Sequence, residues 1–168
     1  DHLVAEGKKV GMVAVHLYRP FSIKHLFAAV PATVKKIAVL DRTKEPGAEG
    51  EPLYLDVKSA YYDQENRPVI VGGRYGLGSS DITPAKIISV FNNLDLPEPK
   101  NHFTVGIVDD VTFTSLPAVE EMALGGKSIY EAKFFGLGAD GTVGANKNSV
   151  KIIGDNTNKH CQAYFSYD

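Results

Sequence analysis

The stretch Lys36–Val57 is the part of this sequence that most restricts the fold. It opens with the short apolar run Ile37–Leu40, which is typical of a fully buried strand. The charged loop Asp41–Gly50 follows, and Glu51-Pro52 then places proline at the first position of a helix, where its missing N–H costs nothing. A strand, a polar loop and a helix make half of a parallel βαβ unit. The loop is longer than the roughly 2–6 residues of an ordinary connector, so we expect it to face a ligand or a partner.

The N-terminal part of the chain repeats this alternation. Apolar runs and turn residues predict further strands at Lys9–Leu17, Val69–Gly72 and, as a pair split by Asp109-Asp110, at His102–Val108 and Val111–Phe113. Helices are predicted at Asp1–Gly7, after the cap Ser22, from Pro52 to about Tyr62, and after Thr83-Pro84, the last with Ile87, Ile88, Phe91 and Leu94 as its buried face. The alternation predicts an α/β fold: a three-layer sandwich whose mostly parallel sheet carries helices on both faces.

The pattern changes near Gly125-Gly126, which suggests one domain over residues 1–124 and the start of another over 125–168. The second part is expected to be an incomplete βαβ unit. Its predicted pieces are a strand at Lys133–Phe135, a glycine-rich loop at Gly136–Gly144, a short helix at Asn146–Ile153 and a strand at Gln162–Tyr167.

Charge and composition exclude several classes of protein. The 168 residues carry a net charge of −2, which argues against a nucleic-acid or anionic-membrane surface. No apolar run approaches the roughly 20 residues that span a bilayer. The single cysteine, Cys161, excludes an intramolecular disulfide framework and a cysteine-ligated iron–sulfur cluster within this chain. The chain has no initiator Met and no signal peptide, so we expect a fragment of a longer cytoplasmic protein.

One motif suggests a ligand. Residues Gly136 to Gly141 fit G-x-G-x-x-G between a predicted strand and a predicted helix, an arrangement in which glycine amides can approach a pyrophosphate. Asp168 is loosely placed for the acidic residue of a dinucleotide site. A tight turn without a ligand explains the same residues, and spacing leaves the two interpretations equal.

Other patterns favour structural explanations. Gly125-Gly126-Lys127-Ser128 resembles the end of a P-loop, but Glu121 stands where the motif needs glycine. The glycine-rich segment Gly72–Asp81 could hold an anion, although a turn followed by a cap at Asp81 or Thr83 explains it better. Asp109-Asp110 could hold Mg²⁺ or form a charged turn, and the five histidines show no ligand spacing.

Four stretches together resemble the pyruvate:ferredoxin (flavodoxin) oxidoreductase family of anaerobic bacteria. They are LYRPF at 17–21, AVLDRTKEPGAEGEPLYLDV at 38–57, VGGRYGLGSSDITP at 71–84 and FFGLGADGTVGANKNSVKIIGDNT at 134–157. The resemblance implies that residues 1–124 are similar to the transketolase C-terminal domain and that 125–168 begin a gamma-type domain. The parent enzymes convert pyruvate and coenzyme A into acetyl-CoA and carbon dioxide, and pass electrons to ferredoxin or flavodoxin.

The resemblance also implies the cofactors and partners. The parent enzyme is expected to use thiamine diphosphate, Mg²⁺ and iron–sulfur clusters, to form a homodimer and to pack this segment against other domains of the same polypeptide. None of these cofactors is expected to be bound by this chain, because the family builds the thiamine pocket from other domains, and no catalytic residue can be carried over. The gamma-type domain contributes to coenzyme A binding, and the matching positions are Gly136, Gly138, Asp140, Gly141, Thr142, Asn146 and Lys147.

Two hypotheses follow. In the first, the chain is a non-catalytic structural and interface segment of such an oxidoreductase. In the second, the glycine loop makes it a free-standing nucleotide-binding module or a small dehydrogenase. Glycine amides and Lys147 suit a phosphate, whereas Asp140 would repel one unless it caps the helix.

Overall fold

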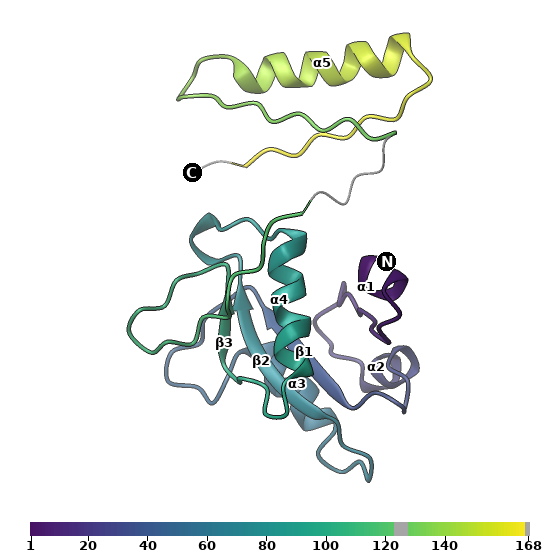
Figure 1. The fold of residues 1–168 in the computed structure, drawn as a ribbon, viewed down its shortest axis with the longest axis vertical. Helices are drawn as coiled ribbons and strands as arrows, with labels where there is room; N and C mark the ends of the chain where they lie inside the picture. Colours follow the sequence, from purple (N-terminus) through teal and green to yellow (C-terminus); the bar gives the residue numbers. More distant parts are fainter. Residues whose placement is uncertain (123–127, 167–168) are drawn as a thin grey trace. The chain divides into compact units, whose positions relative to one another are not determined.

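The computed structural model describes residues 1–122 and 128–166 (Figure 1). The chain divides into two compact units, Asp1–Leu124 and Gly125–Asp168.

The first unit is built on a parallel sheet of three strands in the order β1-β2-β3. The strands are β1 (Lys36–Asp41), β2 (Val69–Tyr75) and β3 (Phe103–Val105). The helices α3 (Pro52–Ala60) and α4 (Pro84–Asp95) connect successive strands, as parallel pairing requires. In the register, Lys36 lies opposite Val69 and Gly73 lies opposite Phe103.

Helices cover the two faces of this sheet, so the predicted three-layer α/β class is confirmed (Figure 1). Because side chains alternate along a strand, β1 contributes Val39 to one layer and Leu40 to the other. The first layer holds the buried residues Val39, Tyr54, Val57 and Tyr61, with Leu26 and Phe27 of helix α2 (Ile23–Ala29) packed against them. The second holds the buried residues Val71, Val90, Phe103 and Val105.

Predicted helix starts agree with the structure where a side chain caps them. Ser22 Oγ accepts a hydrogen bond from the His25 N–H at the start of α2, and Thr83 Oγ1 accepts one from the Lys86 N–H at the start of α4. The remaining short elements of this unit are α1 (His2–Ala5) and a 3₁₀ turn at Leu77–Ser79. No helix among the described residues is both long and apolar enough to cross a membrane.

The predicted buried face of α4 is only partly right, because Leu94 packs against the second layer but is not fully buried. The buried side of the helix carries Ala85, Ser89, Val90 and Asn93, whereas Ile87, Ile88, Phe91 and Leu94 are only partly buried. Asn93 is buried with its hydrogen bonds satisfied, because its amide bonds both the carbonyl and the N–H of Lys100 at 2.9 Å.

Two predicted strands of the first unit are not formed. Lys9–Leu17 has no regular secondary structure and pairs with no strand in the described parts of the chain, and Met12 is 86% exposed. After β3, the Asp109 carboxylate accepts hydrogen bonds from the N–H groups of Val111, Thr112 and Thr114. These bonds wind the chain into a turn, so the strand predicted at His102–Val108 ends at Val105 and the one predicted at Val111–Phe113 does not form.

The second unit contains one helix in its described part, α5 (Thr142–Asn156), which is longer than the predicted Asn146–Ile153. The strands predicted at Lys133–Phe135 and Gln162–Tyr167 are not formed over the residues described, and Tyr167 lies outside them. Phe135 is exposed, so this segment has no packed face that would hold a strand in place.

Candidate functional site

The charged loop between β1 and α3 is anchored at its base by Asp41. Its two carboxylate oxygens accept hydrogen bonds from the N–H groups of Leu53 and Tyr54, each at 3.0 Å. These N–H groups belong to the first turn of α3, where no partner exists within the helix. Burial raises the pKa of Asp41, and the two N–H bonds oppose that rise. From the sequence, Asp41 was predicted to be a loop residue. Its role as the cap of a helix that begins eleven positions later was not predicted.

Tyr54 forms the floor beneath the loop. Its ring is almost fully buried, and its hydroxyl accepts a hydrogen bond from Asn101 Nδ2 at 3.0 Å. Asn101 Oδ1 in turn accepts from the Gly72 N–H at 2.7 Å. A Cβ on Gly50 or Gly72 would lie 2.4 or 2.8 Å from the Tyr54 ring, so both positions need glycine. The loop therefore rests on a rigid base contributed by three separate segments.

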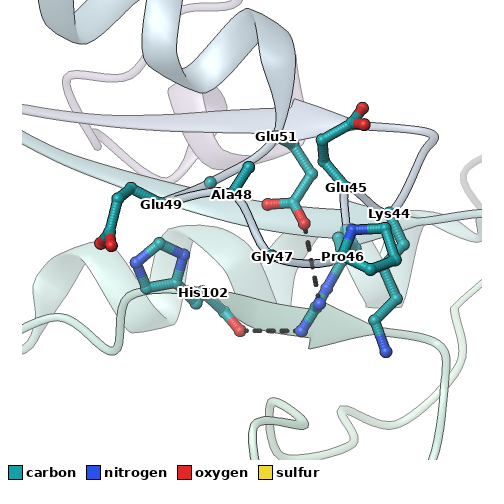
Figure 2. Close-up of a pocket in the computed structure, with 10 residues that line it drawn as sticks. Lys44, Glu45, Pro46, Gly47, Ala48, Glu49, Glu51 and His102 are labelled. Carbon is teal, nitrogen blue, oxygen red and sulfur yellow. Dashed lines mark hydrogen bonds and ion pairs between the residues drawn. The ribbon is translucent and has the colours of Figure 1, made fainter.

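A pocket of about 290 Å³ lies at the carboxyl ends of the strands, between this loop and β2 (Figure 2). Its lining consists of the loop residues Lys44, Glu45, Pro46, Gly47, Ala48, Glu49, Gly50 and Glu51, together with Arg74 and His102. Its position, at the carboxyl ends of β1 and β2, is where open α/β sheets bind ligands.

An ion pair closes one side of the pocket (Figure 2). Arg74 Nη1 lies 3.6 Å from Glu51 Oε1, and Arg74 Nη2 donates to the His102 carbonyl at 3.3 Å. The side chains of Glu51 and Arg74 are 5% and 16% exposed, so the pair is largely removed from water. Glu51 Oε2 and Arg74 Nε are buried and have no hydrogen-bond partner among the described residues. Sequence reasoning missed this pair, because nothing in the sequence joins positions 51, 74 and 102.

The pocket can bind a polar group, and its residues do not form a recognisable catalytic set. The lining carries carboxylates and cations of nearly balanced charge but no hydroxyl or thiol nucleophile. The His102 ring lies edge-on to Tyr54, with ring centroids 5.5 Å apart. Across the described parts of the chain, no three His, Cys, Asp or Glu side chains are grouped to hold a metal ion.

The predicted glycine loop forms a separate, exposed turn in the second unit. Asp140 accepts hydrogen bonds from the N–H groups of Leu137 and Thr142, both at 2.9 Å. Hydrogen bonds from the Thr142 side chain and N–H lower the pKa of Asp140. Asp140 therefore stabilises the start of α5 and occupies amides that a phosphate would otherwise meet.

The structure brings some of the predicted loop residues together and separates others. Gly136 lies against Thr142, and a Cβ there would be 2.7 Å from Thr142 Cβ. Gly138 and Gly141 have φ angles of +61° and +84°, which glycine tolerates best. Asn146 and Lys147 lie on the second turn of α5, and Lys147 Nζ is 5.5 Å from the centroid of the Phe165 ring.

Residues 1–87 match the profile of the family described as "Pyruvate:ferredoxin oxidoreductase core domain II". The match covers just over half of the 168 residues, including β1, the loop, α3 and β2. The chain belongs to this pyruvate:ferredoxin oxidoreductase family. The resemblance inferred from the sequence is thereby confirmed.

Several full-length members of the family are similar over the entire chain. The chain is 60% identical over 169 residues to the pyruvate-flavodoxin oxidoreductase of Enterobacter agglomerans. It is 55% identical over 168 residues to the pyruvate:ferredoxin oxidoreductase of Moorella thermoacetica. In both comparisons 100% of this chain aligns with 14% of the relative, so the chain spans about one seventh of the length of these oxidoreductases.

The remaining candidates in this oxidoreductase segment have structural explanations or lie outside the description. Thr83 caps α4, so the segment after β2 ends as a turn and a cap. Asp109 holds its own turn, and hydrogen bonds from Thr112 and Thr114 keep its pKa well below the usual range. Cys161 is exposed. The P-loop-like residues Gly125, Gly126 and Lys127, and Asp168, lie outside the described residues.

Proposed function

We propose that this chain is a non-catalytic structural and interface segment of an enzyme that oxidatively decarboxylates pyruvate. That enzyme converts pyruvate and coenzyme A into acetyl-CoA and carbon dioxide and reduces ferredoxin or flavodoxin. The observation that carries the proposal is the pocket beside the Lys44–Glu51 loop: it lies at the carboxyl ends of β1 and β2, and a largely buried ion pair forms one of its sides. Such a surface suits docking of another part of the polypeptide.

The two units are assigned different places in that enzyme. We assign residues 1–124 to a domain similar to the transketolase C-terminal domain, and 125–168 to the opening of a gamma-type domain. The family profile over residues 1–87 supports the first assignment, and the motif FFGLGADG at 134–141 supports the second. The alternative, a free-standing nucleotide-binding module, is disfavoured because the whole chain aligns with only 14% of each full-length relative.

The cofactors belong to other parts of the enzyme. Thiamine diphosphate, Mg²⁺ and iron–sulfur clusters are proposed for the parent, which we place in the cytoplasm as a homodimer. A cluster bound by cysteines does not fit this chain, because Cys161 is its single cysteine. No reaction step is therefore assigned to these residues.

The full-length polypeptide is expected to reduce ferredoxin or flavodoxin when pyruvate and coenzyme A are both supplied. The isolated 168-residue chain is expected to give no activity above buffer, because the proposal leaves it without a catalytic group. Reduction of a redox dye, with acetyl-CoA as the product measured, checks both expectations. Pyruvate-dependent dye reduction by the isolated chain would contradict the non-catalytic role, and an inactive full-length protein would contradict the reaction.

We further propose that the turn Gly136–Gly144 contributes to coenzyme A binding in the assembled enzyme. The supporting features are the exposed glycine backbone at the start of the 15-residue helix α5, and the exposed Lys147 one turn further along. The proposed contacts come from Gly136, Gly138, Asp140, Gly141, Thr142, Asn146 and Lys147. In this arrangement Asp140 orders the turn, and Lys147 supplies the positive charge.

In the full-length enzyme, Gly138→Val and Lys147→Ala are expected to raise the Michaelis constant for coenzyme A. The lysine contact contributes about 1.5–3 kcal/mol at most, and valine is strained at the φ of +61°. Pyruvate decarboxylation without coenzyme A should be nearly unchanged, because that step belongs to other domains. Steady-state kinetics for coenzyme A and the half-reaction with pyruvate alone separate the two effects.

Matched variants further along α5 provide the control. Lys151→Ala removes a neighbouring exposed lysine, and Gly154→Val replaces a glycine whose Cβ would meet nothing within 4 Å. Neither should change the constant for coenzyme A. If the test variants also leave that constant unchanged, the loop is only a turn; if they abolish the half-reaction, they have damaged the fold.

A further inference from the structure

The exposed turn before α5 contains a chemically reactive pair of residues, Asp140 followed by Gly141. In such a pair the glycine nitrogen can attack the aspartate side chain, because glycine lacks the Cβ that hinders this approach in other residues. This is the one Asp-Gly pair in the 168 residues, and the sequence contains no Asn-Gly pair, which would react in the same way. Spontaneous rearrangement of the backbone is therefore expected first at this turn.

The rearrangement conserves atoms and needs no reactant other than water. The nitrogen of Gly141 forms a bond to Cγ of Asp140, and the side-chain hydroxyl leaves with the N–H proton as water. Hydrolysis of the resulting succinimide returns that water at one of the two carbonyl carbons. Cleavage at the main-chain carbonyl gives isoaspartate, whose main chain runs through the side-chain carbons, and cleavage at Cγ restores aspartate.

Hydrogen bonds hold both oxygens of the Asp140 carboxylate. The Leu137 N–H donates to Oδ2 and the Thr142 N–H donates to Oδ1, both at 2.9 Å. The carboxylate therefore cannot turn its carbon toward the Gly141 nitrogen without breaking these bonds. Hydrogen bonds from the Thr142 hydroxyl, and from the N–H groups of Thr142 and Leu137, also lower the pKa of Asp140. An ionised carboxylate carries no hydroxyl that could leave as water.

The donors and the carboxylate are fixed by their surroundings. Thr142 is the first residue of the 15-residue helix α5, so its N–H has a defined direction. A Cβ at Gly136 would lie 2.7 Å from Thr142 Cβ and 3.0 Å from Asp140 Oδ1, so the main chain at Gly136 lies against both side chains. The turn therefore restrains Asp140 although the residue is exposed.

We propose that Asp140-Gly141 is the site at which this chain forms isoaspartate, and that the hydrogen bonds from Leu137 and Thr142 slow that reaction in the folded protein. Isoaspartate lengthens the main chain by one carbon and separates the carboxylate from the start of α5. The inference concerns the chemical lifetime of the turn, and it does not depend on coenzyme A binding there.

Peptide mapping of the full-length protein after incubation at neutral pH tests the site and its protection. Trypsin cleaves after Lys133 and Lys147 and releases the peptide 134–147, whose aspartate and isoaspartate forms have equal mass and separate by chromatography. A synthetic peptide of the same residues, incubated in parallel, has no fixed turn. Isoaspartate should form at position 140 in the synthetic peptide, and at least about 10-fold more slowly in the folded protein. Equal rates would overturn the protection, and an unreactive synthetic peptide would overturn the site.

Variants of Thr142 separate the hydroxyl from the shape of the turn. Thr142→Val removes the hydroxyl and should raise the rate in the folded protein by at least about 3-fold, as expected for the loss of one hydrogen bond. Thr142→Ser keeps the hydroxyl and should keep the original rate. Thr157→Val is the matched control, because it removes a hydroxyl that donates to the Ile153 carbonyl at the other end of α5. An unchanged rate in Thr142→Val would contradict the proposal, and so would an equal rise in Thr142→Ser.

Discussion

Gly73→Ala is expected to destabilise the first unit by about 3 kcal/mol or more, which is a large part of the stability of a typical domain. The added Cβ would lie 2.1 Å from Phe103 Cε2 and 2.3 Å from Phe103 Cζ. The Phe103 ring is 0% exposed and is enclosed by Val71, Val90 and Val105, so it has no space into which to move.

Urea unfolding of the 168-residue chain, followed by circular dichroism, measures this loss. Gly11→Ala is the matched control, because a Cβ at Gly11 would meet nothing within 4 Å and its φ is not positive. It should change the free energy of unfolding by no more than about 0.5 kcal/mol. Equal midpoints for the two variants would mean that β2 and β3 are not packed as described.

Tyr54→Ala should cost about 3–5 kcal/mol, as expected when a large aromatic ring is removed from a core. Tyr54 is 1% exposed and lies over Gly50 and Gly72, so its loss leaves a cavity beneath the charged loop. Tyr54→Phe keeps the ring and removes the bond from Asn101 Nδ2, which should cost only about 1–3 kcal/mol. The same unfolding measurement gives both values.

Limited proteolysis provides a second readout for the Tyr54 variants. Trypsin should cleave after Lys44 faster in Tyr54→Ala, because the loop no longer packs on the Tyr54 ring. In Tyr54→Phe the rate of cleavage should be almost unchanged. Tyr62→Ala removes an exposed tyrosine one residue beyond the cap of α3 and should behave like the original chain. A Tyr54→Phe variant as unstable as Tyr54→Ala would show that the polar bond, rather than packing of the ring, holds this region.

The sequence by itself was sufficient to predict the structural features that depend on residues close together in the chain. The apolar run at 37–40 formed β1, Pro52 opened α3, and Ser22 and Thr83 capped their helices. These outcomes depend on burial patterns, on a fixed proline φ and on side chains that reach only three residues along the chain. The α/β class followed from the same alternation, and long stretches of family-like sequence indicated the oxidoreductase.

Only the tertiary structure decided the features that depend on residues far apart. Asp41 caps α3 across a whole loop, and the buried pair of Glu51 and Arg74 is completed by the carbonyl of His102. Asn93 is buried on α4 because Lys100, seven residues further along, supplies partners for its amide. Lys9–Leu17 has the composition of a strand but forms none in the described structure, because a strand exists only where another backbone lies beside it to exchange hydrogen bonds.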